Sequence, residues 1–130
     1  MSKYLIDTNI LIDLLRNKLD VSKFVVSGDL AVSTITLSEL FYGAERTYSP
    51  QSSYNLIDKL INELNLKILS FDDKSSKLFA TLKVKLEKQG QKLEDFDLMI
   101  ASVAVCEKRI LITSNLKHFD RIEELKLWTK

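Results

Sequence analysis

The chain has 130 residues, of which 45% are hydrophobic and 28% charged, and its formal net charge is +1. These values are typical of a single globular domain spanning residues 1–130, and they exclude an intrinsically disordered chain. The balanced charge provides no global field to attract nucleic acid, so such a contact would need local basic patches. Cys106 is the only cysteine, which excludes an internal disulfide and a cysteine-based zinc cluster. No stretch has the length and apolar character of a signal peptide or a membrane span, and we expect a reducing, cytoplasmic setting without membrane partners.

Strand-like apolar runs alternate along the chain with segments of helical periodicity. Strands are expected at residues 3–6, 30–35, 66–71 and 109–113, with a short fifth one at 125–128. The helices between them are expected to start at the N-cap Asn9, at a capping box from Thr36 to Glu39, after a loop at 48–53, at the cap Asp72 and at Asp95 or a neighbour. Gly90 is expected to end the fourth of these helices. Short connections and strict alternation predict an α/β fold, with a central parallel sheet covered by helices on both faces.

Four polar residues lie just after strand-like runs or at the start of helices, far apart in sequence. They are Asp7, Glu39, Asp97 and Asn115. Because the carboxyl ends of parallel strands line one crevice, we expect these side chains to meet there. Three carboxylates brought together repel one another or raise each other's pKa unless a cation lies between them. The pattern therefore predicts a metal site at Asp7, Glu39 and Asp97, and oxygen ligands without sulfur or imidazole favour Mg²⁺ or Mn²⁺.

Each acid also has a structural interpretation when it is taken alone. Asp7 and Asp97 could simply favour a helix start through the helix dipole, and Asp95 competes with Asp97 for either role. Glu39 occupies the last position of the expected capping box, which would explain it without catalysis. Asn115 could be an ordinary turn residue. The shared position of all four at strand exits favours the site interpretation.

Four sequence blocks together resemble the PIN domains, and most closely the VapC toxins of prokaryotic VapBC toxin–antitoxin systems. The blocks read Y-L-I-D-T-N-I-L-I from Tyr4, T-x-x-E-L-x-x-G from Thr36, D-x-x-I-A-S-x-A from Asp97 and L-I-T-S-N-x-x-H-F from Leu111. The resemblance extends from Tyr4 to about Trp128. It implies a three-layer α/β/α sandwich and a Mg²⁺-dependent ribonuclease that leaves a 5′-phosphate and a 3′-hydroxyl.

The resemblance also assigns roles to individual residues. Asp7, Glu39 and Asp97 match the three acids of the family's site, and Asn9 and Thr113 match its supporting polar positions. Many relatives carry Asp where this chain has Asn115, whereas others pair an Asn there with an acid matching Asp120, so the fourth site residue and a second metal stay open. The implied partners are an RNA substrate, an antitoxin protein and a second copy of the chain in a homodimer.

The residue types fit metal-assisted RNA hydrolysis better than the alternatives. A mechanism with paired histidines is excluded because His118 is the only histidine, and we expect it to be a surface residue beside Phe119. Arg16 is a candidate phosphate contact because its helix starts at the site.

Three other classes of protein are alternatives to the nuclease. A receiver domain would need paired acids after the first strand and a lysine after the last one, and a haloacid-dehalogenase-like phosphatase would need Asp where Asn9 stands. A non-catalytic binding domain of the same fold stays open because the fourth acid is missing.

Overall fold

The computed structural model describes residues 2–19 and 28–129. In this part of the chain the order of elements is β1 (Ser2–Ile6), α1 (Thr8–Leu15), β2 (Gly28–Ser33), α2 (Thr34–Glu45), α3 (Pro50–Glu63), β3 (Lys67–Leu69), α4 (Asp73–Lys88), α5 (Asp95–Cys106), β4 (Ile110–Ile112) and α6 (Leu116–Phe119). The described strands form one parallel sheet of four in the order β3-β2-β1-β4. No described helix combines the length and the apolar character that a membrane span requires.

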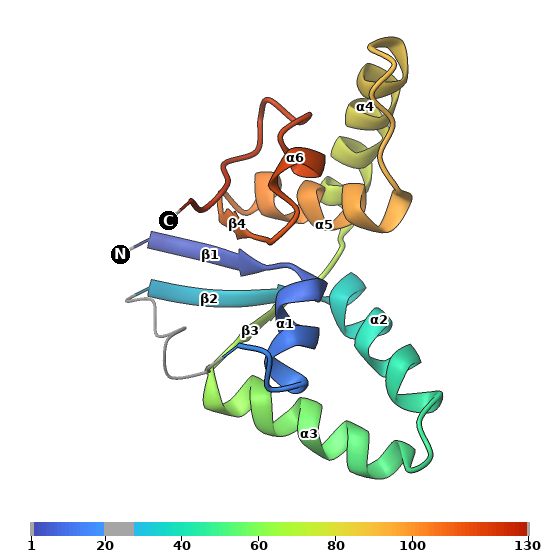
Figure 1. Cartoon of the computed structure of the whole chain (residues 1–130). Helices are drawn as coiled ribbons and strands as arrows, with labels where there is room; N and C mark the ends of the chain where they lie inside the picture. Colours follow the sequence, from blue (N-terminus) through green and yellow to red (C-terminus); the bar gives the residue numbers. More distant parts are fainter. Residues whose placement is uncertain (1, 20–27, 130) are drawn as a thin grey trace.

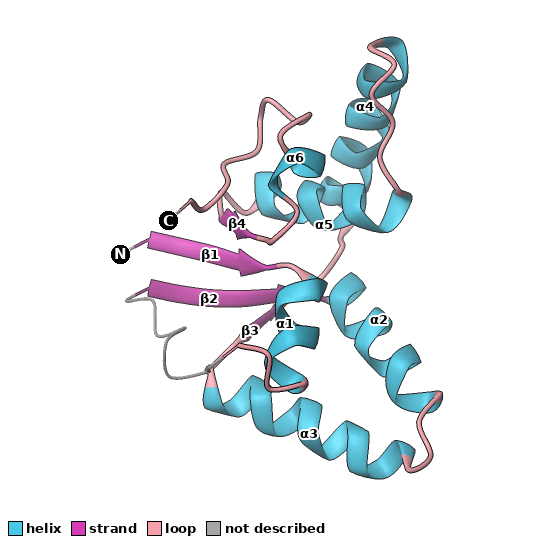
Figure 2. Cartoon of the chain, viewed as in Figure 1, coloured by secondary structure: helices cyan, strands magenta, loops and turns pink. Residues whose placement is uncertain are grey.

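Helices cover both faces of the sheet, as the sequence predicts (Figure 1). Helices α1, α2 and α3 lie on one side, and α4, α5 and α6 lie on the other, so the fold is a three-layer α/β/α sandwich (Figure 2). Successive residues of β1 explain this arrangement. Tyr4 and Ile6 belong to the core under α1–α3, whereas Leu5 belongs to the core under α4 and α5. Because neighbouring side chains of a strand point to opposite faces, an uninterrupted apolar run needs a cover on each side.

Several expected element boundaries are wrong, and helix caps explain most of the differences. The Ser33 hydroxyl accepts a hydrogen bond from Thr36 N at 3.1 Å, so α2 starts at Thr34 and Ile35 is helical. The expected capping box from Thr36 to Glu39 is therefore not formed. Pro50 occupies the first turn of α3, where proline is favoured, so the expected loop at 48–53 is shorter.

Other expected boundaries are confirmed or displaced only slightly. Asp72 caps α4, and Gly90 at φ +66° follows its end, where a left-handed residue is favoured. Glu94 is the cap residue of α5. The expected fifth strand is reduced to a single parallel bridge between Leu111 and Leu127.

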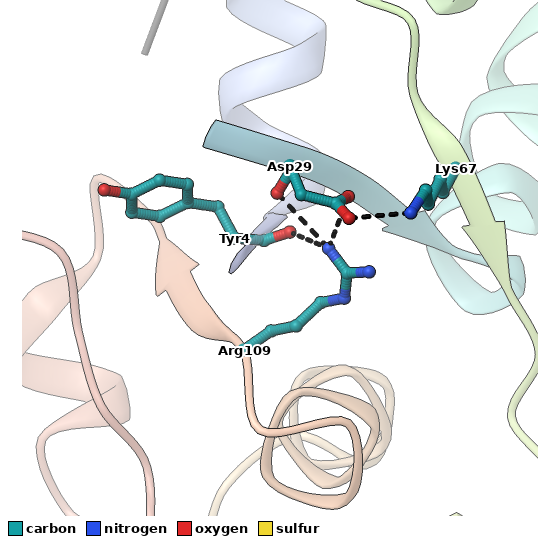
Figure 3. Close-up of polar contacts among 4 residues, drawn as sticks. All are labelled: Tyr4, Asp29, Lys67 and Arg109. Carbon is teal, nitrogen blue, oxygen red and sulfur yellow. Dashed lines mark hydrogen bonds and ion pairs between the residues drawn. The ribbon is translucent and has the colours of Figure 1, made fainter. Parts of the chain in front are cut away.

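The amino-terminal half of the sheet is held by an ion-pair network around the buried Arg109 (Figure 3). Arg109 is only 7% exposed, and its Nη1 donates to Tyr4 O (3.2 Å), Asp29 O (3.2 Å) and Asp29 Oδ1 (3.0 Å). The Lys67 ammonium donates to Asp29 Oδ2 at 2.7 Å. These contacts join β1, β2, β3 and the residue before β4. The hydrogen bonds from Lys67, and then from Arg109, hold the pKa of Asp29 below its ordinary 3.8.

We predict that Asp29→Asn lowers the melting temperature at neutral pH by several degrees, because it leaves the buried Arg109 cation without its carboxylate. The folded pKa of Asp29 lies below the unfolded one, so its contribution is present above pH 3.8 and is lost as the pH falls through the folded value. Melting curves of wild type and variant should therefore converge on acidification. Asp58→Asn, at an exposed site on α3, is the matched control. A gap that stays constant at low pH would contradict this account.

Candidate active site

Asp7 occupies the junction between β1 and α1 and is buried to 2% exposure. Its Oδ1 accepts from Thr8 N at 2.9 Å, and its Oδ2 accepts from Thr113 Oγ1 at 2.7 Å. Asp7 is therefore the N-cap of α1, and the expectation that Asn9 caps this helix is wrong. Burial raises the pKa of Asp7, while the hydrogen bonds from Thr113 and Thr8 oppose that rise. The fold thus buries a carboxyl group in an environment that disfavours its charged form.

Glu39 reaches the same place from α2. The Thr8 hydroxyl donates to Glu39 Oε1 at 2.8 Å and lies 3.0 Å from Thr36 Oγ1. Thr8 therefore links the helix that Asp7 caps to the carboxylate of Glu39. This contact replaces the backbone contact that a capping-box glutamate would make, so helix capping does not account for Glu39.

Asp97 is in the first turn of α5, partly buried, and faces the other two acids. Burial raises the pKa of Asp97 first, and the negative charge of Asp7 adds to this effect. The charge of Glu39 acts in the same direction, and a positive charge on His118 would oppose it. The three acids predicted from the sequence therefore lie within electrostatic reach of one another at the carboxyl edge of the sheet.

His118, expected at the surface, lies instead against Asp97. Its side chain is 26% exposed, and Nε2 is 3.5 Å from Asp97 Oδ2. The Nε2 atom is itself buried and makes no hydrogen bond with the described residues. The ring also lies beside Phe119, with 6.0 Å between ring centroids, as the sequence predicts.

The remaining predicted site residues lie at different distances from the three acids. Thr113 is buried and bonded to Asp7, and its hydroxyl also accepts from Asn115 N at 3.0 Å. Asn115 precedes α6 and is exposed, as is Asn9 in the first turn of α1. Asp120, at the end of α6, is exposed, and no hydrogen bond or ion pair among the described residues joins it to the acids.

Arg16 lies at the far end of α1 from Asp7. It is exposed there and lines a cavity of about 280 Å³ between α1, α2 and α3, which Glu39 also borders. Arg16 and Asp7 are therefore at opposite ends of α1, while Glu39 borders the cavity of Arg16 and is bonded to Thr8 beside Asp7.

Sequence reasoning missed two hydroxyl residues of the site. Thr8 and Ser33 were not candidates, yet Thr8 positions Glu39 and Ser33 caps α2. A threonine next to Asp7 and a serine at the end of a strand were the available signals. Both are common in turns, so a sequence alone gives them little weight.

The chemistry of the site suits a hard divalent cation. Its oxygen donors are the carboxylates of Asp7, Glu39 and Asp97, and the mutual repulsion of these acids would be relieved by a positive ion. Within residues 2–19 and 28–129, no three acidic, histidine or cysteine side chains are drawn together closely enough to hold an ion. The charges of Asp7 and Glu39 therefore act on Asp97, but the three acids do not form a complete coordination shell among the described residues.

A parallel α/β/α sandwich with three acids near its carboxyl edge is typical of a class of nuclease-like domains, and comparisons with known proteins specify it further. The family model described as "PIN domain" matches residues 4–125. The chain is 36% identical to "Ribonuclease VapC2" of Haemophilus influenzae over 97% of this chain and 96% of that protein. It is 30% identical to "tRNA(fMet)-specific endonuclease VapC" of Shigella flexneri over the same shares.

A solved structure agrees with these matches. The crystal structure of VapBC2 from Rickettsia felis bound to a promoter DNA fragment has a TM-score of 0.87 and 29% identity, covering 97% of this chain and 98% of that one. The chain belongs to the PIN domain family and, within it, to the VapC ribonucleases. The predicted family, fold and enzyme class are therefore confirmed. PIN-domain ribonucleases in general depend on divalent metal ions.

We predict that Asp97→Asn leaves the metal-free protein as stable as wild type or slightly more stable at neutral pH. The raised pKa of Asp97 means that its charge is disfavoured in the fold, and Asn removes that charge at nearly the same volume. Thermal melts in EDTA measure this difference, with Asp13→Asn on α1 as the control. A large loss of stability would show that Asp97 has a structural role at the start of α5.

Proposed function

We propose that this chain is a Mg²⁺- or Mn²⁺-dependent endoribonuclease acting as the toxin of a type II toxin–antitoxin system. The observation that carries the proposal is the electrostatic coupling of Asp7, Glu39 and Asp97 at one edge of a PIN-domain sheet. Acids whose pKa values are shifted by burial and by neighbouring charges are concentrated at functional sites. The relatives named as VapC ribonucleases support RNA as the substrate.

In this proposal, Asp7, Glu39 and Asp97 hold the ion. A bound divalent ion would lower the pKa of an attacking water and stabilise charge at the phosphorus and the leaving oxygen. Asp7 is fixed by its bonds to Thr8 N and the Thr113 hydroxyl, which orient both carboxylate oxygens. Thr8 orients Glu39. Asp7 and Asp97 both have raised pKa values, so a neighbouring cation would promote the ionisation of both acids.

The other assignments of the sequence analysis belong to the same proposal. Asn9 and Thr113 support the acids, and either Asn115 or Asp120 provides the fourth site residue. Arg16 contacts a substrate phosphate from the exposed end of α1. The domain spans residues 1–130.

The proposed partners follow from the solved relatives. Structures of VapBC from Rickettsia felis and Salmonella typhimurium, both bound to DNA, support a protein antitoxin that pairs with this chain. We further propose a homodimer and a cytoplasmic location, in line with bacterial toxin–antitoxin proteins. Co-purification with the protein encoded beside this chain tests the antitoxin directly.

Purified protein freed of antitoxin should cut cellular RNA in Mg²⁺ and stop when EDTA is added. Addition of Mn²⁺ in excess of EDTA should restore cleavage, because either ion suits three carboxylates. The products should carry 5′-phosphates, which ligation-based mapping of the ends detects. Equal cleavage in EDTA would contradict the metal mechanism.

The substitution Glu39→Gln separates function from structure. The Gln Oε1 can still accept from the Thr8 hydroxyl, so we predict little change in melting temperature. Loss of the charge should depress RNA cleavage by at least about 100-fold, because even partners of metal ligands are worth roughly 10- to 100-fold. Glu45→Gln, one to two turns further along α2, is the matched control.

Wild-type cleavage by Glu39→Gln would exclude Glu39 from the metal site. Asp120 or Asp95 would then become the next candidate for the third carboxylate.

A further inference from the structure

An open cavity of about 710 Å³ lies beside the proposed catalytic acids. Glu39 borders it from α2, His118 borders it from α6, and the third side is the start of α5 with the loop before it. The residues on that third side are Lys92, Leu93, Glu94, Asp95, Phe96 and Asp97. The cavity therefore opens directly onto two of the proposed catalytic acids, Glu39 and Asp97.

Phe96 is the unusual member of this lining. It is 55% exposed, whereas the later apolar residues Leu98 and Ile100 of the same helix are almost fully buried. Packing therefore does not explain a phenylalanine at this position. A single exposed apolar residue is ordinary on a protein surface, but this one directly precedes Asp97 in the first turn of α5.

The charge of the cavity limits how RNA can be held there. Glu39, Glu94, Asp95 and Asp97 are acidic, and Lys92 is the only lysine or arginine among the described lining residues. Lys83 Nζ donates to Asp95 Oδ1 at 2.9 Å and compensates that carboxylate, but without a bound cation the other acids repel phosphates. An interaction that does not depend on charge would therefore add affinity. Stacking of an unpaired base on an aromatic ring meets this requirement, and it tolerates any base.

The loop that carries Lys92 is tied to the rest of the domain. Arg121 Nη1 donates to Lys92 O at 2.7 Å, which fixes the backbone of the loop next to the cavity. The Lys92 side chain is exposed and free to reach a phosphate at the rim. A cation at the rim and an exposed ring next to Asp97 match the two contacts that single-stranded RNA needs, one to the backbone and one to a base.

We propose that Phe96 stacks an unpaired base of the RNA next to the phosphate to be cut, and that Lys92 contacts a neighbouring phosphate. This inference rests on the proposed ribonuclease function, and it assigns to the site a substrate-binding residue outside the acids. The ring positions the strand, and the acids act on the phosphate that follows or precedes the stacked base.

Binding can be measured in EDTA, where neither metal nor cleavage contributes. The probes are a short oligoadenylate and an abasic ribose-phosphate chain of equal length, each labelled for fluorescence anisotropy. Phe96→Ala should weaken oligoadenylate binding by about 5- to 150-fold, the range measured for base–aromatic stacking. It should leave the abasic chain unaffected. Lys92→Met should weaken both probes, because both carry phosphates, while Lys88→Met on α4 should weaken neither.

Two further variants separate stacking from apolar packing. Phe96→Trp should bind oligoadenylate at least as well as wild type, because it keeps an aromatic face. Phe96→Leu should behave like Phe96→Ala. Tyr48→Ala, at an exposed aromatic outside the cavity, is the matched control. Circular dichroism confirms that each variant is folded.

Cleavage of cellular RNA in Mg²⁺ provides the second measurement, and it separates the two proposals. Wild-type protein that cuts RNA, with Phe96→Ala cutting more slowly and Phe96→Trp restored, supports the inference. Equal binding and cleavage by Phe96→Ala would overturn it and would leave the ring as a contact for a protein partner. Absence of cleavage by the wild type would contradict the ribonuclease proposal, while the binding measurement in EDTA would still decide the role of Phe96.

Discussion

The site depends on one buried carboxyl group, that of Asp7 at the end of β1. Its two oxygens accept from Thr8 N and from Thr113 Oγ1, so they join the start of α1 to the exit of β4. Thr8 then holds Glu39 of α2. Burial disfavours the charged form of Asp7. The buried carboxyl group lies where the β1–α1 junction, the exit of β4 and α2 meet. In the proposed function, this arrangement orients Asp7 and Glu39, two of the three proposed metal ligands.

The acids at the two ends of the sheet have opposite pKa shifts, because their charges are compensated to different degrees. In the amino-terminal half, the buried Arg109 and the Lys67 ammonium neutralise Asp29 and lower its pKa. At the carboxyl edge, the charges of Asp7 and Glu39 act on Asp97, and His118 is the one described residue whose positive charge would oppose them, so the pKa of Asp97 is raised. Satisfied charges hold the strands together at one end, and the uncompensated charges at the other end support the proposed metal site there.

The sequence was sufficient to predict the layers of the fold and the proximity of three acids at its carboxyl edge. Continuous apolar strand runs require cover on both faces, and residues at strand exits of a parallel sheet must meet, so Asp7, Glu39 and Asp97 could be placed together. Helix boundaries were less predictable. Asp7 and Asn9 are both good N-caps, as are Ser33 and Thr36, and only the backbone geometry decides between the members of each pair.

The sequence alone did not predict individual contacts between side chains. The position of His118 against Asp97 depends on how α6 packs near α5, and no periodicity encodes it. The hydroxyl of Thr8 is polar but uncharged. Its role depends on a 2.8 Å hydrogen bond to the carboxylate of Glu39, which is 31 residues away in sequence. The exposure of Phe96 likewise follows from the tertiary arrangement.

The central claim is that Asp7, Glu39 and Asp97 act together as one metal site, and Mn²⁺ binding followed by electron paramagnetic resonance tests it most directly. Antitoxin-free wild type should bind Mn²⁺ saturably, and Asp7→Asn, Glu39→Gln and Asp97→Asn should each abolish or strongly weaken that binding. Asp13→Asn should bind as wild type does. Equal Mn²⁺ binding by all of these variants would contradict the account, because the ion would then be held elsewhere.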